Sequence, residues 1–349
     1  MFDWAGKRIL VTGHTGFKGA WLSEVLLRRG AEVFGLALEP ETQPSLFDQL
    51  NLAARLNHRI GDIRHLDTVR ERVAQAKPQM VFHLAAQSLV RRSYRDPLGT
   101  WGSNVMGTVC LLEALRDVEG PCACVVVTTD KVYRNREWEF PYRETDALGG
   151  HDPYSASKAA AELVAGSFRN SFFAAGAKVR LATARAGNVI GGGDWAEDRL
   201  LPDLARAYAK GETLSVRNPD ATRPWQHVLD PLAGYMILAE HLWATPVPAE
   251  HAFNFGPEQD AQRSVEQVVS AATQTWPGTY VTLSEENPVH EAGKLSLGIE
   301  RSRHVLGWKP RWGFERAIAE AVDWYRQVAS GADTCTVTEA QIAAFEASR

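Results

Sequence analysis

The stretch "VTGHTGFKGAWL" (residues 11–22) constrains the fold more than any other, because it sets three glycines at three-residue steps between an apolar run and an amphipathic one. A strand that turns sharply into a helix directs several backbone N–H groups and the positive end of the helix dipole at one point. In such a turn Gly13 permits the bend, Gly16 leaves room for a pyrophosphate, and Gly19 lets the helix pack closely on the strand. An ordinary glycine-rich turn is the alternative, but the strand before and the helix after favour a dinucleotide-binding turn.

The first half of the chain alternates short β-branched runs with longer patterns of helical spacing. Runs that are apolar on both faces and separated by helices predict a parallel sheet covered on both sides. We therefore expect an α/β fold, a Rossmann-type doubly wound parallel sheet with a smaller, mixed α/β substrate-binding domain. The expected strands are 8–13, 32–38, 58–63, 80–86, 123–129 and 178–191.

Beyond the last of these strands the regular alternation gives way to short segments that are richer in Pro, Trp and Arg. We expect the dinucleotide-binding domain to comprise residues 1–188, with about 226–256 returning to it. The substrate-binding domain is then expected to comprise 189–225 and 257–330, followed by a C-terminal helical tail over 331–349.

Composition and charge exclude several classes of partner. The formal net charge of -4 provides no basic field for nucleic acid or an anionic membrane surface. No run of 18 apolar residues occurs, and the N-terminal "MFDWAGKRILVTG" has no leader pattern, so we expect a cytoplasmic protein without membrane contact. The four cysteines lack metal-ligand spacing and disulfide density, which predicts reduced thiols and no metal site.

The segment "PYSASK" places Tyr154 and Lys158 four residues apart, on one face of an expected helix. A phenol with an ordinary pKa of about 10 is a poor base at neutral pH, so a nearby ammonium that favours the phenolate is what such a base needs. The spacing is common by itself, but about 140 residues after a dinucleotide turn it indicates a base for an alcohol proton.

The segments "TGHTGFKG", "HLAAQ", "SNVMGT", "VTTDKVY" and "YSASK" together resemble the extended short-chain dehydrogenase/reductase family over nearly the whole chain. Within that family, "ALEPETQPSLF", "TTDKVY", "GNVIGGGDW", "RPWQHVLDPL" and "HEAGKL" are most similar to the CDP-glucose 4,6-dehydratase branch. The last four of these segments are far more specific than the glycines.

The resemblance implies a role for each polar residue that follows the strand 123–129. Thr129 would hydrogen-bond the sugar 4-hydroxyl while Tyr154, supported by Lys158, removes its proton and the C4 hydride passes to a nicotinamide. Asp130 would protonate the departing C6 hydroxyl. Lys131 stands where relatives acting on dTDP-glucose have Glu, so it is either a neutral base for the C5 proton or a cation that stabilises an enolate. The alternative for Asp130 and Lys131 is a pair of ordinary surface charges.

The cofactor implied is NAD rather than NADP, because no Arg or Lys occurs between Val33 and Ala54, where a 2'-phosphate would lie. His14, Lys18 or Arg64 are the alternatives that could supply some positive charge for a 2'-phosphate. Glu39 is the acidic residue at the expected distance for the adenosine ribose, although Ala37 occupies the position where Asp is often found. The expected cofactor-binding residues are Gly13, Thr15, Gly16, Phe17, Gly19, Glu39, Asp62, Ile63, Leu84, Ala85, Ala86, Tyr154 and Lys158.

The implied substrate is a nucleotide-sugar, with CDP-glucose first and dTDP-, GDP- or UDP-sugars as alternatives. Arg side chains suit its diphosphate because the guanidinium forms paired, charge-assisted hydrogen bonds. The expected substrate-binding residues are Gln87, Asn104, Asn188, Asp194, Trp195, Arg199, Arg223, Trp225 and His290, with Glu291 beside the last.

Two rival functions are weighed against dehydration. A 4-epimerase or decarboxylase of the same family shares the glycines and the Tyr–Lys pair but lacks an acid and a second proton-handling group directly after Thr129. A non-catalytic dinucleotide sensor is expected to lose Tyr154 or Lys158, and both are present.

The resemblance also implies a homodimer or a dimer of dimers, paired through "GTVCLLEALRD" and the Tyr154 helix. It further implies a role in deoxysugar supply for bacterial surface polysaccharide such as O-antigen.

Overall fold

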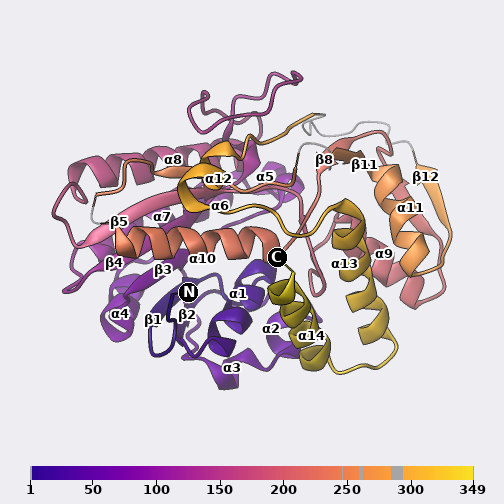
Figure 1. Ribbon diagram of the computed structural model, residues 1–349, viewed down its shortest axis with the longest axis horizontal. Coiled ribbons are helices and arrows are strands. Elements are labelled where there is room, and N and C mark those ends of the chain that lie inside the picture. Colours follow the sequence, from indigo (N-terminus) through magenta and orange to yellow (C-terminus); the bar gives the residue numbers. More distant parts are fainter. Residues whose placement is uncertain (1, 246, 259–261, 284–293, 349) are drawn as a thin grey trace.

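A six-stranded parallel sheet forms the centre of the computed structural model, which describes residues 2–245, 247–258, 262–283 and 294–348 (Figure 1). The chain enters at β1 and moves outward in both directions, as doubly wound folds do. The predicted α/β fold with a doubly wound parallel sheet is confirmed. From one edge to the other the strands are β2 (Glu32–Leu36), β1 (Arg8–Thr12), β3 (Met80–His83), β4 (Cys122–Val127), β5 (Val179–Arg185) and β10 (Ala252–Asn254).

Two hydrophobic cores cover the two faces of this sheet, because neighbouring strand residues point in opposite directions. In β1, Ile9 and Val11 belong to the core with α1 (Phe17–Arg28) and α10 (Leu229–Ala244), whereas Leu10 belongs to the opposite core. That second core is closed by α4 (Leu66–Ala76), α7 (Gly107–Leu115) and part of α8 (Pro153–Ser171).

A smaller layer lies beside the carboxyl-end edge of the sheet and contains three two-stranded sheets, seen with their helices to the right in Figure 1. Strand β7 (Leu214–Arg217) pairs with β12 (Tyr280–Leu283), β8 (Thr222–Pro224) with β11 (Gln262–Ser264), and β6 (Val189–Ile190) with β9 (Gln226–His227). The remaining elements are α2 (Leu46–Gln49), α3 (Leu52–Arg55), α5 (Val90–Arg95), α6 (Pro97–Trp101), the π-helix η1 (Gly102–Met106), the 3-10 helix η2 (Asp130–Val132), α9 (Leu200–Ala209), α11 (Val265–Thr275), α12 (Glu300–Leu306), α13 (Phe314–Ala329) and α14 (Thr334–Ala347).

Two of the predicted strands are wrong in extent. The segment 58–63 forms a single isolated bridge, Ile60 with Ala37 just after β2, because it lies at the open edge of the sheet and its apolar Ile60 remains 39% exposed. The segment 178–191 is interrupted after β5, where Asn188 takes a left-handed conformation with φ of 49°. This bend turns the chain out of the main sheet, and β6 pairs with β9 instead.

No helix within the described ranges is long and apolar enough to cross a membrane. Among the same residues there is no group of three or more His, Cys, Asp or Glu side chains placed to hold a metal ion. All four cysteines are free thiols, and three of them are buried.

Candidate active site

The glycine turn between β1 and α1 leaves a space that side chains at the glycine positions would fill; we call this space the glycine cradle. Gly13 has a φ of +77°, and a Cβ there would lie 2.6 Å from the Ala85 nitrogen. A Cβ at Gly19 would lie 2.1 Å from the Gly13 oxygen, whereas at Gly16 the nearest atom is 3.5 Å away. Gly16 caps α1, and the N–H groups of the first helical turn have no acceptor within the helix. This arrangement fits the pyrophosphate of a dinucleotide.

A cavity of about 640 Å³ extends from this turn, past the ends of β1, β3 and β4, to the smaller layer. The ends of parallel strands are where ligands bind in open α/β sheets. Every expected cofactor-binding residue lines this cavity, as do all five expected catalytic residues. It is also lined by most of the expected substrate-binding residues, namely Gln87, Asn188, Asp194, Trp195, Arg199, Arg223 and Trp225.

Asn104 is not among the residues that line this cavity, contrary to its expected contact with substrate. It is 1% exposed in the π-helix, where its amide accepts a hydrogen bond from Gln87 N–H (2.8 Å) and donates to the Gln87 carbonyl (3.0 Å) and the Ser157 hydroxyl (2.8 Å). Its amide is therefore used to hold the loop after β3 against α8. His290 and Glu291 lie outside the described residues.

Tyr154 and Lys158 lie in the first turns of α8, which Asp152 caps by accepting from Ser155 N–H at 2.9 Å, with Pro153 as the first helical residue. Burial raises the pKa of Tyr154 to about 12, and a hydrogen bond with Thr129 opposes that rise. Lys158 donates to the Val127 carbonyl at 3.0 Å, and burial lowers its pKa to about 8. Without a bound ligand the phenol is therefore protonated at neutral pH, and the phenolate needs a further positive charge.

Asp130 is 1% exposed and is held at both carboxyl oxygens. The Thr129 hydroxyl donates to one oxygen at 2.9 Å, and the Asn188 amide donates to the other at 3.3 Å. A Cβ at Gly187 would lie only 1.9 Å from this carboxyl, so the space for Asp130 exists because residue 187 is glycine. Tyr154 lines the same cavity as Thr129 and Asp130, and Thr129 opposes the rise in the pKa of Tyr154, so the phenol, hydroxyl and carboxyl are available to one ligand.

Lys131 follows directly and also lines the cavity, but its side chain is partly exposed. Its backbone N–H donates to the Thr129 hydroxyl at 3.4 Å, which begins the short 3-10 helix after β4. The chain therefore presents a carboxyl and an ammonium from consecutive residues to the same space.

The expected substrate residues form a second wall on the smaller layer. Arg199 pairs with Asp194 at 3.5 Å. The Trp195 indole N–H donates to Gln49 at 3.1 Å, and that of Trp225 donates to the Arg263 carbonyl at 3.0 Å. Both indoles are thus oriented by their own hydrogen bonds.

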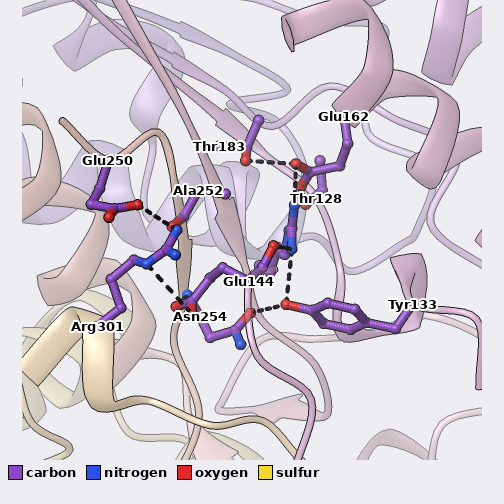
Figure 2. Close-up of polar contacts among 10 residues, drawn as sticks. Thr128, Tyr133, Glu144, Glu162, Thr183, Glu250, Ala252, Asn254 and Arg301 are labelled. Carbon is purple, nitrogen blue, oxygen red and sulfur yellow. Dashed lines mark hydrogen bonds and ion pairs between the residues drawn. The ribbon is translucent and has the colours of Figure 1, made fainter. Parts of the chain in front are cut away.

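A buried polar network supports the residues around Thr128 (Figure 2). The Glu162 carboxylate, one helical turn after Lys158, accepts from the hydroxyls of Thr128 (2.6 Å) and Thr183 (2.7 Å) and from Arg185 at 2.9 and 2.8 Å. Burial opposes its ionisation, but Arg185 and the hydroxyls outweigh burial and lower the pKa of Glu162. Arg185 reaches the Tyr133 hydroxyl at 2.9 Å. Thr128 lies between Val127, whose carbonyl accepts from Lys158, and Thr129. The network therefore holds the end of β4, which carries Thr129 and Asp130, in place.

Beyond Tyr133 the network continues toward the edge of the sheet. The Tyr133 hydroxyl donates to Asn254 at 2.7 Å, and Arg301 of α12 pairs with Glu250 at 2.8 Å (Figure 2). These contacts tie β10 and α12 to the strands that carry the site.

Sequence reasoning underrated one residue, Lys18, which it considered only as a partner for a 2'-phosphate. The side chain lines the cavity, and Asp130, Asp194, Arg199 and Lys158 all affect its pKa. The available signal was a lysine between the second and third glycines, at the start of a helix whose following residues are buried.

The family profile described as GDP-mannose 4,6 dehydratase matches residues 10–321. The chain is 46% identical over 347 residues to CDP-glucose 4,6-dehydratase of Salmonella typhimurium, which covers 98% of this chain and 97% of that protein.

Solved structures show the same architecture. MoeE5 in complex with UDP-glucose and NAD is 25% identical, with a TM-score of 0.78 over 93% of this chain and 99% of that one. UDP-glucose 4-epimerase of Thermotoga maritima with UDP-glucose is 20% identical and has a TM-score of 0.79 over 92% of this chain and 99% of that one.

Proposed function

Because the chain belongs to the extended short-chain dehydrogenase/reductase family, among its nucleotide-sugar 4,6-dehydratases, we propose that it converts CDP-D-glucose to CDP-4-dehydro-6-deoxy-D-glucose and water. The observation that carries this proposal is a single cavity lined by Tyr154, Thr129 and Asp130, in which the Thr129 hydroxyl donates to Asp130 at 2.9 Å. An alcohol base and a carboxylic acid that line the same cavity are able to serve one sugar ring.

NAD is the proposed cofactor. The glycine cradle supports it, and so does the absence of Arg and Lys between Val33 and Ala54. Of the cationic candidates for a 2'-phosphate, His14 is buried against His58 with its pKa lowered by burial to about 3, and Arg64 is paired with Asp62 at 2.5 Å. When bound, NAD supplies the hydride acceptor for C4 and the hydride donor for C6, and the positive charge of its oxidised ring favours the phenolate.

Tyr154 then accepts the proton of the 4-hydroxyl, which Thr129 holds in place. The resulting ketone makes the C5 proton acidic, and Lys131 is proposed to serve C5. It is either the base that takes this proton or the cation beside the enolate while Tyr154 or another group takes it, and the proton returns to C5 when C6 is reduced. Asp130 gives its proton to the C6 oxygen as the carbon–oxygen bond breaks, and water leaves. General acid catalysis of this kind contributes about 10²–10⁴-fold to a rate.

Replacing Asp130 by Asn should slow elimination more than oxidation, by about 10²-fold or more, because the amide keeps the shape but supplies no acidic proton. A 4-keto, 6-hydroxy sugar should then accumulate together with reduced cofactor. Rapid-quench mass spectrometry, combined with the ultraviolet absorbance of the cofactor, measures both steps. An equal fall in the two rates would refute the acid assignment.

The test of the substrate is a panel of CDP-, dTDP-, GDP- and UDP-glucose incubated with the purified protein and NAD, followed by mass spectrometry for the loss of one water. We expect loss from CDP-glucose. Loss confined to another nucleotide would correct the substrate, and no loss from any would refute dehydration. A change at C4 without water loss would favour the epimerase alternative.

We also propose a homodimer, which is able to pair further into a dimer of dimers. Leu163 is 65% exposed on α8, one of the two helices expected to meet, and two further apolar side chains are exposed on the elements just before α7, the other one: Leu98 (85%) on α6 and Met106 on the π-helix. Light scattering after gel filtration measures the mass directly. The expected cytoplasmic location and the role in deoxysugar supply stay predictions from the sequence.

A further inference from the structure

Lys18 is the second residue of α1 and lies between the second and third glycines of the turn. Its side chain is partly buried and lines the cavity. Within the described residues no hydrogen bond or ion pair of its ammonium is found, which is unusual for a charged group at this depth. The ammonium therefore faces the space that ligands and water share with the reacting groups.

Charged groups of η2, of α8 and of the segment between β6 and α9 are electrostatically coupled to this ammonium. Burial lowers the pKa of Lys18 to about 7, and the cations Arg199 and Lys158 lower it further, while the carboxylates Asp130 and Asp194 act in the opposite direction. A lysine so placed exchanges its proton near neutral pH. The neighbouring cations are less suited to do so, because a guanidinium keeps its proton and Lys158 is committed to the Val127 carbonyl.

Tyr235 of α10 lies beside Lys18. The centre of its ring lies 6.0 Å from the Lys18 nitrogen, and its buried hydroxyl has no hydrogen-bond partner among the residues that the structure describes. Burial raises the pKa of Tyr235, and Tyr154 and Asp130 raise it further. A second phenol and a second ammonium are thus electrostatically coupled to Asp130, in addition to the Tyr154 and Lys158 pair.

The proposed reaction requires a proton for Asp130 in every turnover. Tyr154 gains the proton of the 4-hydroxyl, and Asp130 loses one to the departing oxygen. Asp130 accepts hydrogen bonds from Thr129 and Asn188. Once it has given up its proton to the departing oxygen, it needs a nearby proton donor before it can act as an acid in the next turnover.

We propose that Lys18 donates a proton to Asp130 and so prepares Asp130 to act as the acid. Lys18 is thus a positioning residue that acts through Asp130, and this proposal rests on the function proposed above. The Lys18 ammonium passes a proton through one intervening hydroxyl or water to the Asp130 carboxylate. Asp130 passes that proton to the C6 oxygen as the carbon–oxygen bond breaks and water leaves. The free amine regains a proton from solvent while Tyr154 releases the one it took from the 4-hydroxyl, so the net change is the loss of one water.

The test compares Lys18→Met, which removes charge and proton, with Lys18→Arg, which keeps the charge but does not release a proton at neutral pH. Single-turnover experiments with CDP-glucose and NAD follow oxidation by cofactor absorbance and elimination by mass spectrometry. We expect both variants to oxidise C4 within about threefold of the wild-type rate, to lose water about 10²-fold more slowly, and to accumulate reduced cofactor. The wild-type elimination rate should change with pH near pH 7, where Lys18 loses its proton, and this change should be absent from both variants.

Lys210→Met removes an exposed lysine charge after α9 and is the matched control, with wild-type rates expected. Thermal unfolding and calorimetry of NAD binding establish that each variant is folded and binds cofactor. Full elimination in Lys18→Arg would show that charge alone suffices and would overturn the proposal, as would normal turnover in Lys18→Met or an equal fall in both steps. Failure of the proposed function itself is distinguishable, because the wild-type protein would then lose no water from CDP-glucose.

Discussion

Tyr154→Phe should abolish reduction of bound NAD by CDP-glucose, with a loss of at least about 10²–10⁴-fold in the oxidation rate. The phenol is the proposed acceptor of the 4-hydroxyl proton, and the substitution removes its oxygen. The ring itself remains to fill its buried position. Stopped-flow absorbance measures cofactor reduction, and calorimetry should find NAD affinity within a few-fold of wild type.

Tyr208→Phe provides the matched control for this variant. Tyr208 is also buried, but its hydroxyl has no hydrogen-bond partner in the described part of the chain and it does not belong to the cavity lining, so loss of this hydroxyl should leave oxidation unchanged. Near-normal oxidation in Tyr154→Phe would remove the phenol from the mechanism. A parallel loss in Tyr208→Phe would trace the effect to packing instead of proton transfer.

The glycine turn and the Tyr154 helix were predictable because each is a local pattern. Gly13, Gly16 and Gly19 act within one turn, and the Tyr154 and Lys158 spacing requires only one helix. The segment 58–63 was mistaken for a full strand because periodicity does not report whether a strand has neighbours on both edges.

The parts of the site that escaped prediction depend on contacts between distant segments. Asn104 looked like a substrate contact, yet its amide is used by Gln87 and Ser157, which only the packing of the π-helix on α8 decides. Lys18 is electrostatically coupled to Asp130 across more than one hundred residues of chain. Its depth in the cavity, which sets its pKa, follows from how α1 packs and not from its neighbours in sequence.

The partnership of Glu162 with Arg185 was likewise invisible in the sequence, and it leads to the second large expected effect. Both side chains are 4% exposed, and the two groups share two hydrogen bonds. A buried ion pair adds little compared with well-packed apolar residues, but removing one member leaves an uncompensated charge in the interior. The remaining cation then has to be solvated, or the surrounding structure has to open.

Glu162→Gln should therefore destabilise the protein by about 3–5 kcal/mol, measured as the free energy of unfolding in urea. Glu32→Gln is the control, because Glu32 pairs with Arg8 at 2.9 Å on the surface, where such a pair contributes only about 0–1 kcal/mol. Since the folded pKa of Glu162 lies below its ordinary value of 4.5, its contribution is complete above that pH and is lost as pH falls through the folded pKa. The wild-type protein should lose this stability in acid, and Glu162→Gln should not. Equal losses of unfolding free energy in Glu162→Gln and Glu32→Gln would mean that the buried ion pair does not stabilise the structure around the site.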